Sequence, residues 1–418
     1  MVGQIANDPL FRDGIDLEVV LIVIAKTLFV FVLLLISVLV IIVAERKIVA
    51  DMQNRIGPNR AGWRGMLQSL ADGTKLFFKE QSIPGGADHV IFRLAPYLSL
   101  LPAFLAFSVI PLGREFEVPF TDKRTTLQLV DLPMGVLFVL AMSGLGIYGV
   151  LLAGWASGSK YPLLGSVRAS AQMVSYEAAL GIAIIGAVLQ AETLSTRQIV
   201  VNQGFPGADP LDWFFVVGFV PFCIFVLAAV AETNRAPFDL VEAEQELVGG
   251  FHTEYTGIRF AMFFLAEYMN MVTQSAIATT LFLGGPSGPR PGFVPDLVGD
   301  VGWFLAKVSV FIFGYIWLRA ALPRLRYDQL MDFGWKYLIP IGLLWLGISA
   351  VFQIGDDEGW PEGVYIPAAL IGGLAVFGFL RACWPRHQPH PVVPRAPRQP
   401  ARSVVPGGTP YPGEGGKQ

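Results

Sequence analysis

Charged side chains interrupt the long apolar runs of this sequence, where an ionised group is energetically costly. On insertion scales each charge at the middle of a bilayer costs about 2.5–3.5 kcal/mol. Ion pairs between helices, or side chains that reach the membrane surface, explain any single one about as well as a function does. Together they favour a polar route through the protein. They are Lys26, Glu177, Glu267 and Lys307 within such runs, and Glu232 at the end of one.

The segment after Glu232 carries carboxylates at spacings suited to proton transfer. Glu242 and Glu246 are four residues apart and would share a helical face, which Asp239 extends, with Glu244 between them. Like charges this close raise one another's pKa, so that some hold protons near neutral pH and can pass them on. A solvated acidic loop is the simpler interpretation, but the interleaved apolar residues favour burial.

Three glycines, Gly144, Gly146 and Gly149, form the pattern GxGxxG. That pattern indicates dinucleotide binding only between a strand and a helix. Here it lies inside an apolar run, with no acidic residue at the expected distance. Small residues that let two helices approach closely are the favoured interpretation, and we do not expect the chain to bind NAD.

The two cysteines, Cys223 and Cys383, are far apart, and the histidines do not cluster with them. This spacing has no signature of an iron–sulfur or zinc site. No metal site is therefore expected, and any electron carrier is expected in another chain.

The elements that must position these residues are membrane-spanning helices. Hydrophobic residues make up 53% of the chain and charged residues only 15%, against about 25% charged residues in soluble proteins. Apolar runs of about 18 residues or more are long enough to cross a bilayer. We predict an all-α integral membrane protein of eight core transmembrane helices plus a ninth. Their expected ranges are 19–43, 91–112, 134–156, 169–189, 213–231, 260–283, 301–322, 337–352 and, for the ninth, 364–384.

Lysines and arginines gather in the loop after the first span and in the loop before the eighth, although Arg114, Lys123 and Arg124 are an exception. The positive-inside rule then places the basic loops in the cytoplasm and the N-terminus outside. Within the first loop, Gly57 and Pro58 predict a turn, and anchoring to anionic lipid explains its arginines about as well as a specific site.

An amphipathic helix at the cytoplasmic surface is expected over 63–80, where apolar and polar residues fall on opposite faces. The chain then divides into an N-terminal segment (1–18), a core membrane domain (19–352), a loop with the ninth helix (353–385), and a disordered Pro/Gly-rich cytoplasmic tail (386–418).

Several stretches, taken in order, resemble one family: the H subunit of respiratory complex I, the counterpart of mitochondrial NADH dehydrogenase subunit 1. The resemblance covers about residues 17–352, and the ordered set is specific although any one stretch is not. One departure is Ala243, where the family usually has glycine between two glutamates. The stretches include AERK at 44–47, QNRIGPNR at 53–60, SYE at 175–177, AETNR at 231–235, ELVGGFHTEY at 246–255, AEY at 266–268 and LPRLRYDQLM at 322–331.

The resemblance implies a membrane subunit of a proton-pumping NADH-quinone oxidoreductase, in the inner (plasma) membrane of a bacterial cell. The enzyme's substrate would be a quinone, ubiquinone or menaquinone. FMN and the iron–sulfur clusters would belong only to partner subunits, since this chain has no NADH, flavin or iron–sulfur site. Partners would be the peripheral-arm subunits of the quinone site, the other membrane-arm subunits and membrane lipid, and no nucleic acid.

The resemblance also implies roles for residues at matching positions. The quinone chamber would include Arg46, Arg55, Asp72, Arg235, Asp239 and Phe264. The proton-coupling carboxylates would be Glu177, Glu232, Glu242, Glu244, Glu246, Glu254 and Glu267. Interface or structural positions would be Lys75, Glu80, Arg168, Arg324 and Arg326.

Two alternatives remain open from the sequence. The related membrane subunit of a proton-translocating hydrogenase shares the family's ancestry but need not reduce quinone. A stand-alone secondary transporter belongs to another class and predicts internal repeats, and we find no repeat.

Overall fold

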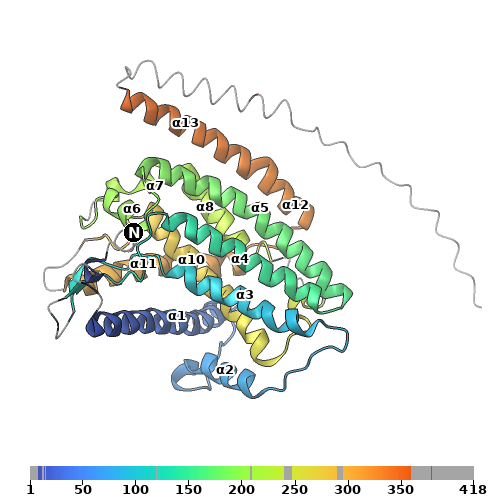
Figure 1. Ribbon diagram of the computed structural model, residues 1–418. Helices are drawn as coiled ribbons and strands as arrows, with labels where there is room; N and C mark the ends of the chain where they lie inside the picture. Colours follow the sequence, from blue (N-terminus) through green and yellow to red (C-terminus); the bar gives the residue numbers. More distant parts are fainter. Residues whose placement is uncertain are drawn as a thin grey trace, which may run out of the picture.

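In the computed structural model of the protein, the described residues are 8–11, 14, 16–118, 121, 123–207, 210–239, 247–289, 295–358 and 378. They are almost entirely helical (Figure 1). Two short strands, β1 (Phe116–Glu117) and β2 (Arg124–Thr125), pair antiparallel between α3 and α4. The all-α membrane class is therefore confirmed.

Six helical segments are long and apolar enough to cross a membrane. One shorter apolar helix, α8 (Phe219–Glu232), lies among them, as does α10 (Gly257–Phe282), which is long enough but less apolar. The number of eight spans stays a prediction, and the ninth expected helix falls outside the described residues except for residue 378. The six are α1 (Leu17–Met52), α3 (His89–Phe107), α4 (Gly135–Ala156), α5 (Lys160–Ala191), α11 (Asp296–Ala321) and Tyr327–Gly355.

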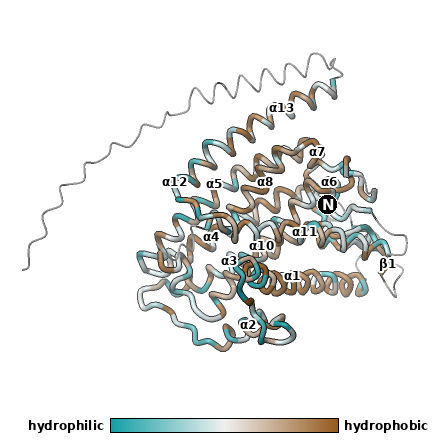
Figure 2. Tube along the Cα trace, turned by 180° about the vertical axis from the view of Figure 1, so that it is seen from behind, coloured by the Kyte–Doolittle hydropathy of each residue, from teal (hydrophilic) through white to brown (hydrophobic). Residues whose placement is uncertain are grey.

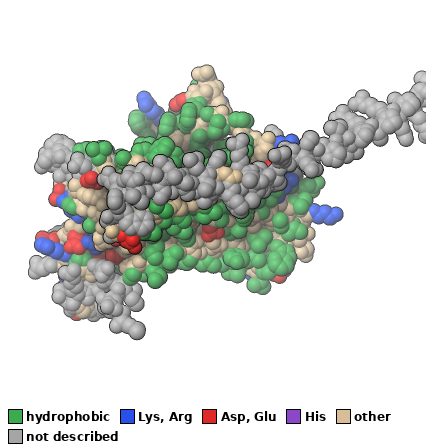
Figure 3. Space-filling model, turned by 90° about the horizontal axis from the view of Figure 1, so that it is seen from above, with side chains coloured by type: hydrophobic (Ala, Val, Ile, Leu, Met, Phe, Trp, Pro, Cys, Tyr) green, Lys and Arg blue, Asp and Glu red, His purple; other side chains and the backbone are tan. Residues whose placement is uncertain are grey.

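The membrane faces follow helical periodicity. Along α1, Val30, Leu34 and Val38 are buried at every fourth position, whereas Leu21 and Leu28 on other faces are exposed. Figure 2 shows α1 as mostly hydrophobic, and in Figure 3 the described residues that are visible are mostly hydrophobic, with many of the charged side chains toward the ends of the face. An apolar exterior of this size fits lipid or partner helices rather than water.

The core is built around α5. Tyr176, Leu180 and Ile184 repeat every four residues on one of its faces and are fully buried. They belong to the same hydrophobic cluster as Phe225 of α8 and Phe282 of α10. This packing brings the middle of α5, which carries Glu177, close to the end of α8, which carries Glu232.

Two expected elements differ from the structure. The span expected over 213–231 is wrong as a continuous helix, because Gly218 separates α7 (Phe214–Val217) from the 14-residue α8. The eighth span begins earlier than expected: α12 (Tyr327–Phe333) continues through a π-helical turn, Gly334–Leu338, into α13 (Ile339–Asp357). Pro340 has no N–H to donate to an earlier carbonyl, which accounts for the wider turn before it.

The expected surface segment 63–80 is helical mainly over α2 (Gln68–Phe78), preceded by one 3-10 turn. Arg64 and Gly65 have positive φ angles, and a Cβ at Gly65 would overlap the Pro58 carbonyl oxygen. The chain therefore turns sharply there. α2 lies outside the bundle beside α1, on the side opposite α13 (Figure 1).

One glycine of the pattern, Gly149, serves helix packing, as the favoured interpretation held, whereas a Cβ at Gly146 would meet nothing within 4 Å. A Cβ at Gly149 of α4 would overlap Ser99 Oγ of α3 and lie 2.6 Å from Ser99 N. Only a residue without a side chain allows the two helices this approach.

Candidate functional site

Two of the five membrane charges have local structural partners. Lys26 Nζ of α1 lies 2.8 Å from Asp8 Oδ2 and also contacts Thr125, which joins the N-terminal segment and β2 to α1. Lys307 Nζ of α11 donates to the backbone carbonyl oxygens of residues 283, 285 and 287, at 2.5, 3.0 and 2.7 Å. For these two residues the structural interpretation holds, and the three glutamates converge elsewhere.

Glu45, a buried residue of α1, lies at the centre of a polar cluster. Its carboxylate accepts hydrogen bonds from Tyr268 Oη of α10 at 2.6 Å and from Arg319 of α11. It also lies 3.4 Å from Arg235 Nη1, in the segment after α8. One carboxylate thus joins four parts of the chain, and it balances two guanidinium groups that burial would otherwise disfavour.

Arg235 extends this cluster to a second carboxylate. Its Nε lies 3.0 Å from Glu267 Oε1, and its guanidinium carbon lies 4.2 Å from the centre of the Tyr268 ring. Burial by itself would lower the pKa of Arg235, but Glu267, Tyr268 and Glu45 outweigh it and hold the pKa above its ordinary value. Arg235 therefore remains a fixed positive charge between Glu45 and Glu267.

Arg46, the next residue after Glu45, faces outward and holds the surface helix. Successive residues of an α-helix point about 100° apart, so Glu45 enters the bundle while Arg46 reaches α2. Arg46 Nη1 lies 2.5 Å from Asp72 Oδ2, and Gln68 donates to Asp72 Oδ1 at 3.1 Å. Partial burial would raise the pKa of Asp72, but these two bonds and nearby positive charge hold it below its usual value.

Asp239 lies where two loops meet. Arg324, just after α11, donates to Asp239 Oδ2 at 2.9 Å. The backbone N–H of Leu325 donates to the Pro237 carbonyl at 3.0 Å. The segments that follow α8 and α11 are thus fixed together beside Arg235.

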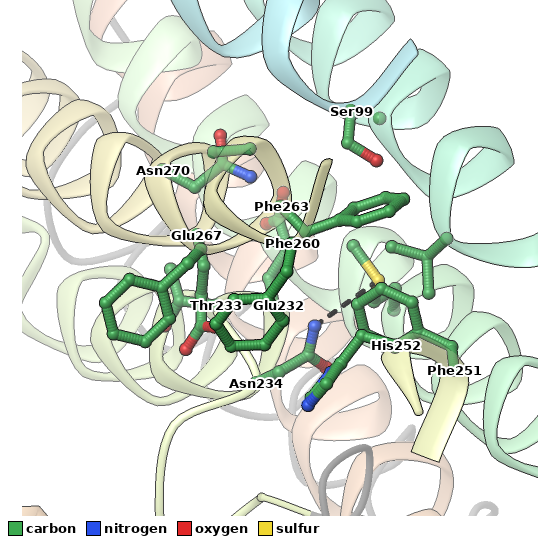
Figure 4. A pocket seen from close by; sticks show the side chains of 15 residues that line it. Ser99, Glu232, Thr233, Asn234, Phe251, His252, Phe260, Phe263, Glu267 and Asn270 are labelled. Carbon is green, nitrogen blue, oxygen red and sulfur yellow. Dashed lines mark hydrogen bonds between the residues drawn. The ribbon is translucent and has the colours of Figure 1, made fainter. Parts of the chain in front are cut away.

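A cavity of about 50 Å³ lies between α3, α4, α8, α10 and the segment after α8. One water molecule needs about 10–15 Å³ of such volume, so the space holds a few waters. Glu232 and Glu267 both line it, together with polar Asn234, His252, Asn270 and Ser99 and with the aromatic rings of Phe251, Phe260, Phe263 and Phe264 (Figure 4). The cavity therefore joins Glu267 of the Arg235 cluster to the buried Glu232.

Glu232 and Glu177 approach the same turn of α4. Ser143 Oγ donates to Glu232 Oε1, and a Cβ at Gly144 would lie 3.1 Å from Glu177 Oε1. The two carboxylates are close enough for their charges to interact. The carboxylates thus form a series from Glu45 through Glu267 and Glu232 to Glu177.

Other residues singled out from the sequence lie apart from this series. Arg55 is exposed and donates to Gln53, and Glu254 is half-buried in the loop before α10. Lys75 of α2 and Glu80, which follows α2, are exposed. The guanidinium carbon of Arg168 lies 5.9 Å from the centre of the Tyr327 ring, and Arg326 is at the start of α12. Glu242, Glu244 and Glu246 lie outside the described residues.

Sequence reasoning missed several members of the site. Glu45 and Tyr268 lie within matching stretches, AERK and AEY, yet neither was singled out. Arg319, one of the arginines that gather before the eighth expected span, was not singled out either. Ser143 has no signal in the sequence, because only the fold brings α4 against the end of α8.

Among the described residues, no group of three or more His, Cys, Asp or Glu side chains is arranged to hold a metal ion. The arrangement that is present suits protons instead, because carboxylates alternate with water-sized space and with fixed positive charge.

Comparisons with known proteins agree over most of the chain. A family model described as NADH dehydrogenase matches residues 25–350. A protein of Frankia casuarinae, named as the H subunit of NADH-quinone oxidoreductase, is 52% identical over 380 residues, which cover 88% of this chain and 81% of the relative. A protein of the same name from Frankia alni is 52% identical over 378 residues, with the same coverage of each chain.

Proposed function

We propose a function from one premise: the chain belongs to the NADH dehydrogenase family, as an H subunit of NADH-quinone oxidoreductase. It forms part of the quinone chamber and couples reduction of the quinone to proton translocation through its buried carboxylates. The names of the relatives favour this function over a hydrogenase subunit or a stand-alone transporter.

One observation carries the proposal. Glu267 is paired with Arg235 on one side and, on the other, lines with Glu232 a cavity that holds a few waters. A change of charge near Arg235 would alter how strongly Glu267 holds a proton. Water in the cavity then gives that proton a path to Glu232, and Glu177 follows at the same turn of α4.

The quinone headgroup itself needs more room than this cavity offers. Small-molecule sites usually have volumes of about 300–1,000 Å³, against about 50 Å³ here. The chamber is therefore completed by peripheral-arm subunits over the cytoplasmic ends of the helices, where Arg46, Asp72 and Asp239 lie. Arg55 and Phe264 belong to its wall, and Lys75, Glu80, Arg168, Arg324 and Arg326 to its docking surface.

The carboxylates outside the described series belong to the same route. Glu254 and the acidic segment with Glu242, Glu244 and Glu246 would receive protons near the chamber and pass them toward Glu232. The complex lies in the bacterial plasma membrane with the N-terminus outside. Its quinone is ubiquinone or menaquinone, and FMN and iron–sulfur clusters belong to the partner subunits.

The chamber is tested with Arg46→Gln and Asp239→Asn in membranes that contain the whole complex. Each variant removes a charge that fixes a loop or helix beside the chamber, so NADH-to-quinone turnover should fall about tenfold or more. NADH oxidation by a water-soluble electron acceptor should stay normal, because it needs only the partner subunits.

The matched controls are Arg60→Gln and Asp328→Asn, which change exposed residues of the same kinds. They should retain wild-type quinone turnover. Full quinone turnover in both chamber variants would refute the assignment of these residues to the chamber.

A further inference from the structure

His252 lines the cavity between the carboxylates, and the proposed function gives it no role. It ends the short η5 helix (Gly250–His252), before α10. Its ring packs edge-on against Phe251 and Phe260, with ring centres 5.1 and 5.3 Å apart. Figure 4 shows it among the side chains that line the cavity. The imidazole is thus held in one place by two aromatic rings.

Its ring nitrogens are available for proton exchange. Within the part of the chain that the structure describes, no side chain or backbone group forms a hydrogen bond with either nitrogen. The backbone is fixed instead, since Tyr255 N–H donates to the His252 carbonyl at 2.9 Å. The ring lines the cavity, so its nitrogens are left to water, and a neutral imidazole donates from one nitrogen and accepts at the other.

The elements packed against η5 include α4 and α5, which supply Gly146, Val150 and Met173 to the cavity wall, while the charged groups come from α8 and α10. The end of α8 and its following segment supply Glu232, Asn234 and Asp239, and α10 supplies Glu267. Burial lowers the pKa of His252, and the negative charge of Asp239 opposes that effect without cancelling it. The ring is neutral at physiological pH, and Asp239 favours its brief protonation.

We propose that His252 transfers protons between Asp239, at the edge of the chamber, and the cavity that contains Glu232 and Glu267. A proton binds one ring nitrogen and another leaves from the second nitrogen to cavity water, so the ring returns to its neutral form. The aromatic contacts leave the imidazole little freedom except to exchange its tautomer. The inference rests on the proposed function and names a further residue for it.

The test compares His252→Phe and His252→Ala in membranes with the whole complex. Phenylalanine keeps the ring packing but cannot carry a proton, so quinone turnover should fall about tenfold, in line with the size of acid–base effects. Alanine leaves room for added imidazole, which should restore turnover about threefold or more. His89→Phe, an exposed histidine at the start of α3, is the control and should behave as wild type.

Wild-type turnover in His252→Phe would overturn the inference, because the ring's shape alone would then suffice. Low turnover in both variants with no response to imidazole would overturn it too, since that result indicates a packing role. Glu232→Gln, measured in parallel, separates the two proposals. If Glu232→Gln loses turnover while His252→Phe keeps it, only the histidine's role fails; if both keep it, the carboxylate route fails as well.

Discussion

Glu45 shows how a single buried charge holds several elements together. It balances Arg235 and Arg319 and accepts the hydrogen bond of Tyr268, so its loss leaves two guanidinium groups without their shared partner. Removing one partner of a buried ion pair typically costs about 3–5 kcal/mol.

Glu45→Gln should therefore lower the temperature at which this subunit dissociates from the complex, compared with the wild type. The measurement is the temperature at which the purified complex loses the chain on heating. Glu18→Gln, on the same helix and exposed, is the control and should leave that temperature unchanged. Equal temperatures for the two variants would mean that the cluster does not stabilise the fold.

His252 should also contribute to the pH dependence of stability. Its folded-state pKa lies below the ordinary value of 6.5, mainly because of burial. The unfolded chain therefore binds more protons as the pH falls through this range, and the ring's contribution, complete above pH 6.5, is lost progressively as the pH falls.

His252→Phe cannot bind a proton, so its stability should fall less in acid than that of the wild type. The difference in unfolding temperature, wild type minus variant, should decrease between about pH 7.5 and about pH 5.5. If this difference in unfolding temperature instead increases as the pH falls, the folded state favours the protonated ring over the neutral one, which would contradict the prediction.

The residue types alone predicted part of the site. Glu177, Glu232 and Glu267 were recognised because a charge inside an apolar run is costly and therefore needs a reason. The assignment of Arg46, Asp72 and Asp239 to the quinone chamber came only from the family resemblance, although Asp239 was also noted from its spacing to Glu242 and Glu246. The pairing of Glu45 with Arg319 was not predicted, because the two residues are far apart in the sequence and their meeting depends on the packing of α1 against α11.

The contact of α3 with α4 depends on the absence of a side chain at Gly149. A Cβ there would come within 3.0 Å of the Ala95 carbonyl and closer to Ser99, so the helices must separate. Gly149→Ala should cost about 1–3 kcal/mol through overpacking, measured as a lower unfolding temperature of the complex.

The control is Gly181→Ala in α5, where a Cβ would meet nothing within 4 Å. It should be neutral or slightly stabilising, since alanine favours a helix over glycine. If the two variants behave alike, the close approach of α3 and α4 is not needed for stability.

Hydropathy predicted which segments become membrane helices but not where they break. Residues 213–231 have a high mean hydropathy and were predicted as one span, because an average over many residues is hardly changed by the single glycine that ends α7. Hydropathy also missed that α12 leads through a π turn into α13, since Tyr327–Phe333 is too polar to be read as part of a span. Local backbone geometry decided both boundaries.

Over the whole molecule, the carboxylates from Glu45 to Glu177 form one series inside an apolar bundle, apart from the contacts of Lys26 and Lys307. Glu45 and Arg235 lie toward the surface helix, the cavity follows, and Glu232 and Glu177 end the series deep among α4, α5 and α8. The sequence indicated that such a route should exist. Its course depends on contacts between distant segments, which neither spacing nor composition contains.

The most direct measurement is NADH-to-quinone turnover together with proton pumping, in membranes with the whole complex, for wild type, Glu177→Gln and the control Glu192→Gln. Glu192 is exposed at the end of the same helix. We predict that Glu177→Gln loses about tenfold or more of both activities while the complex stays assembled, and that the control keeps both. Unchanged quinone reduction and pumping in Glu177→Gln would contradict the coupling route.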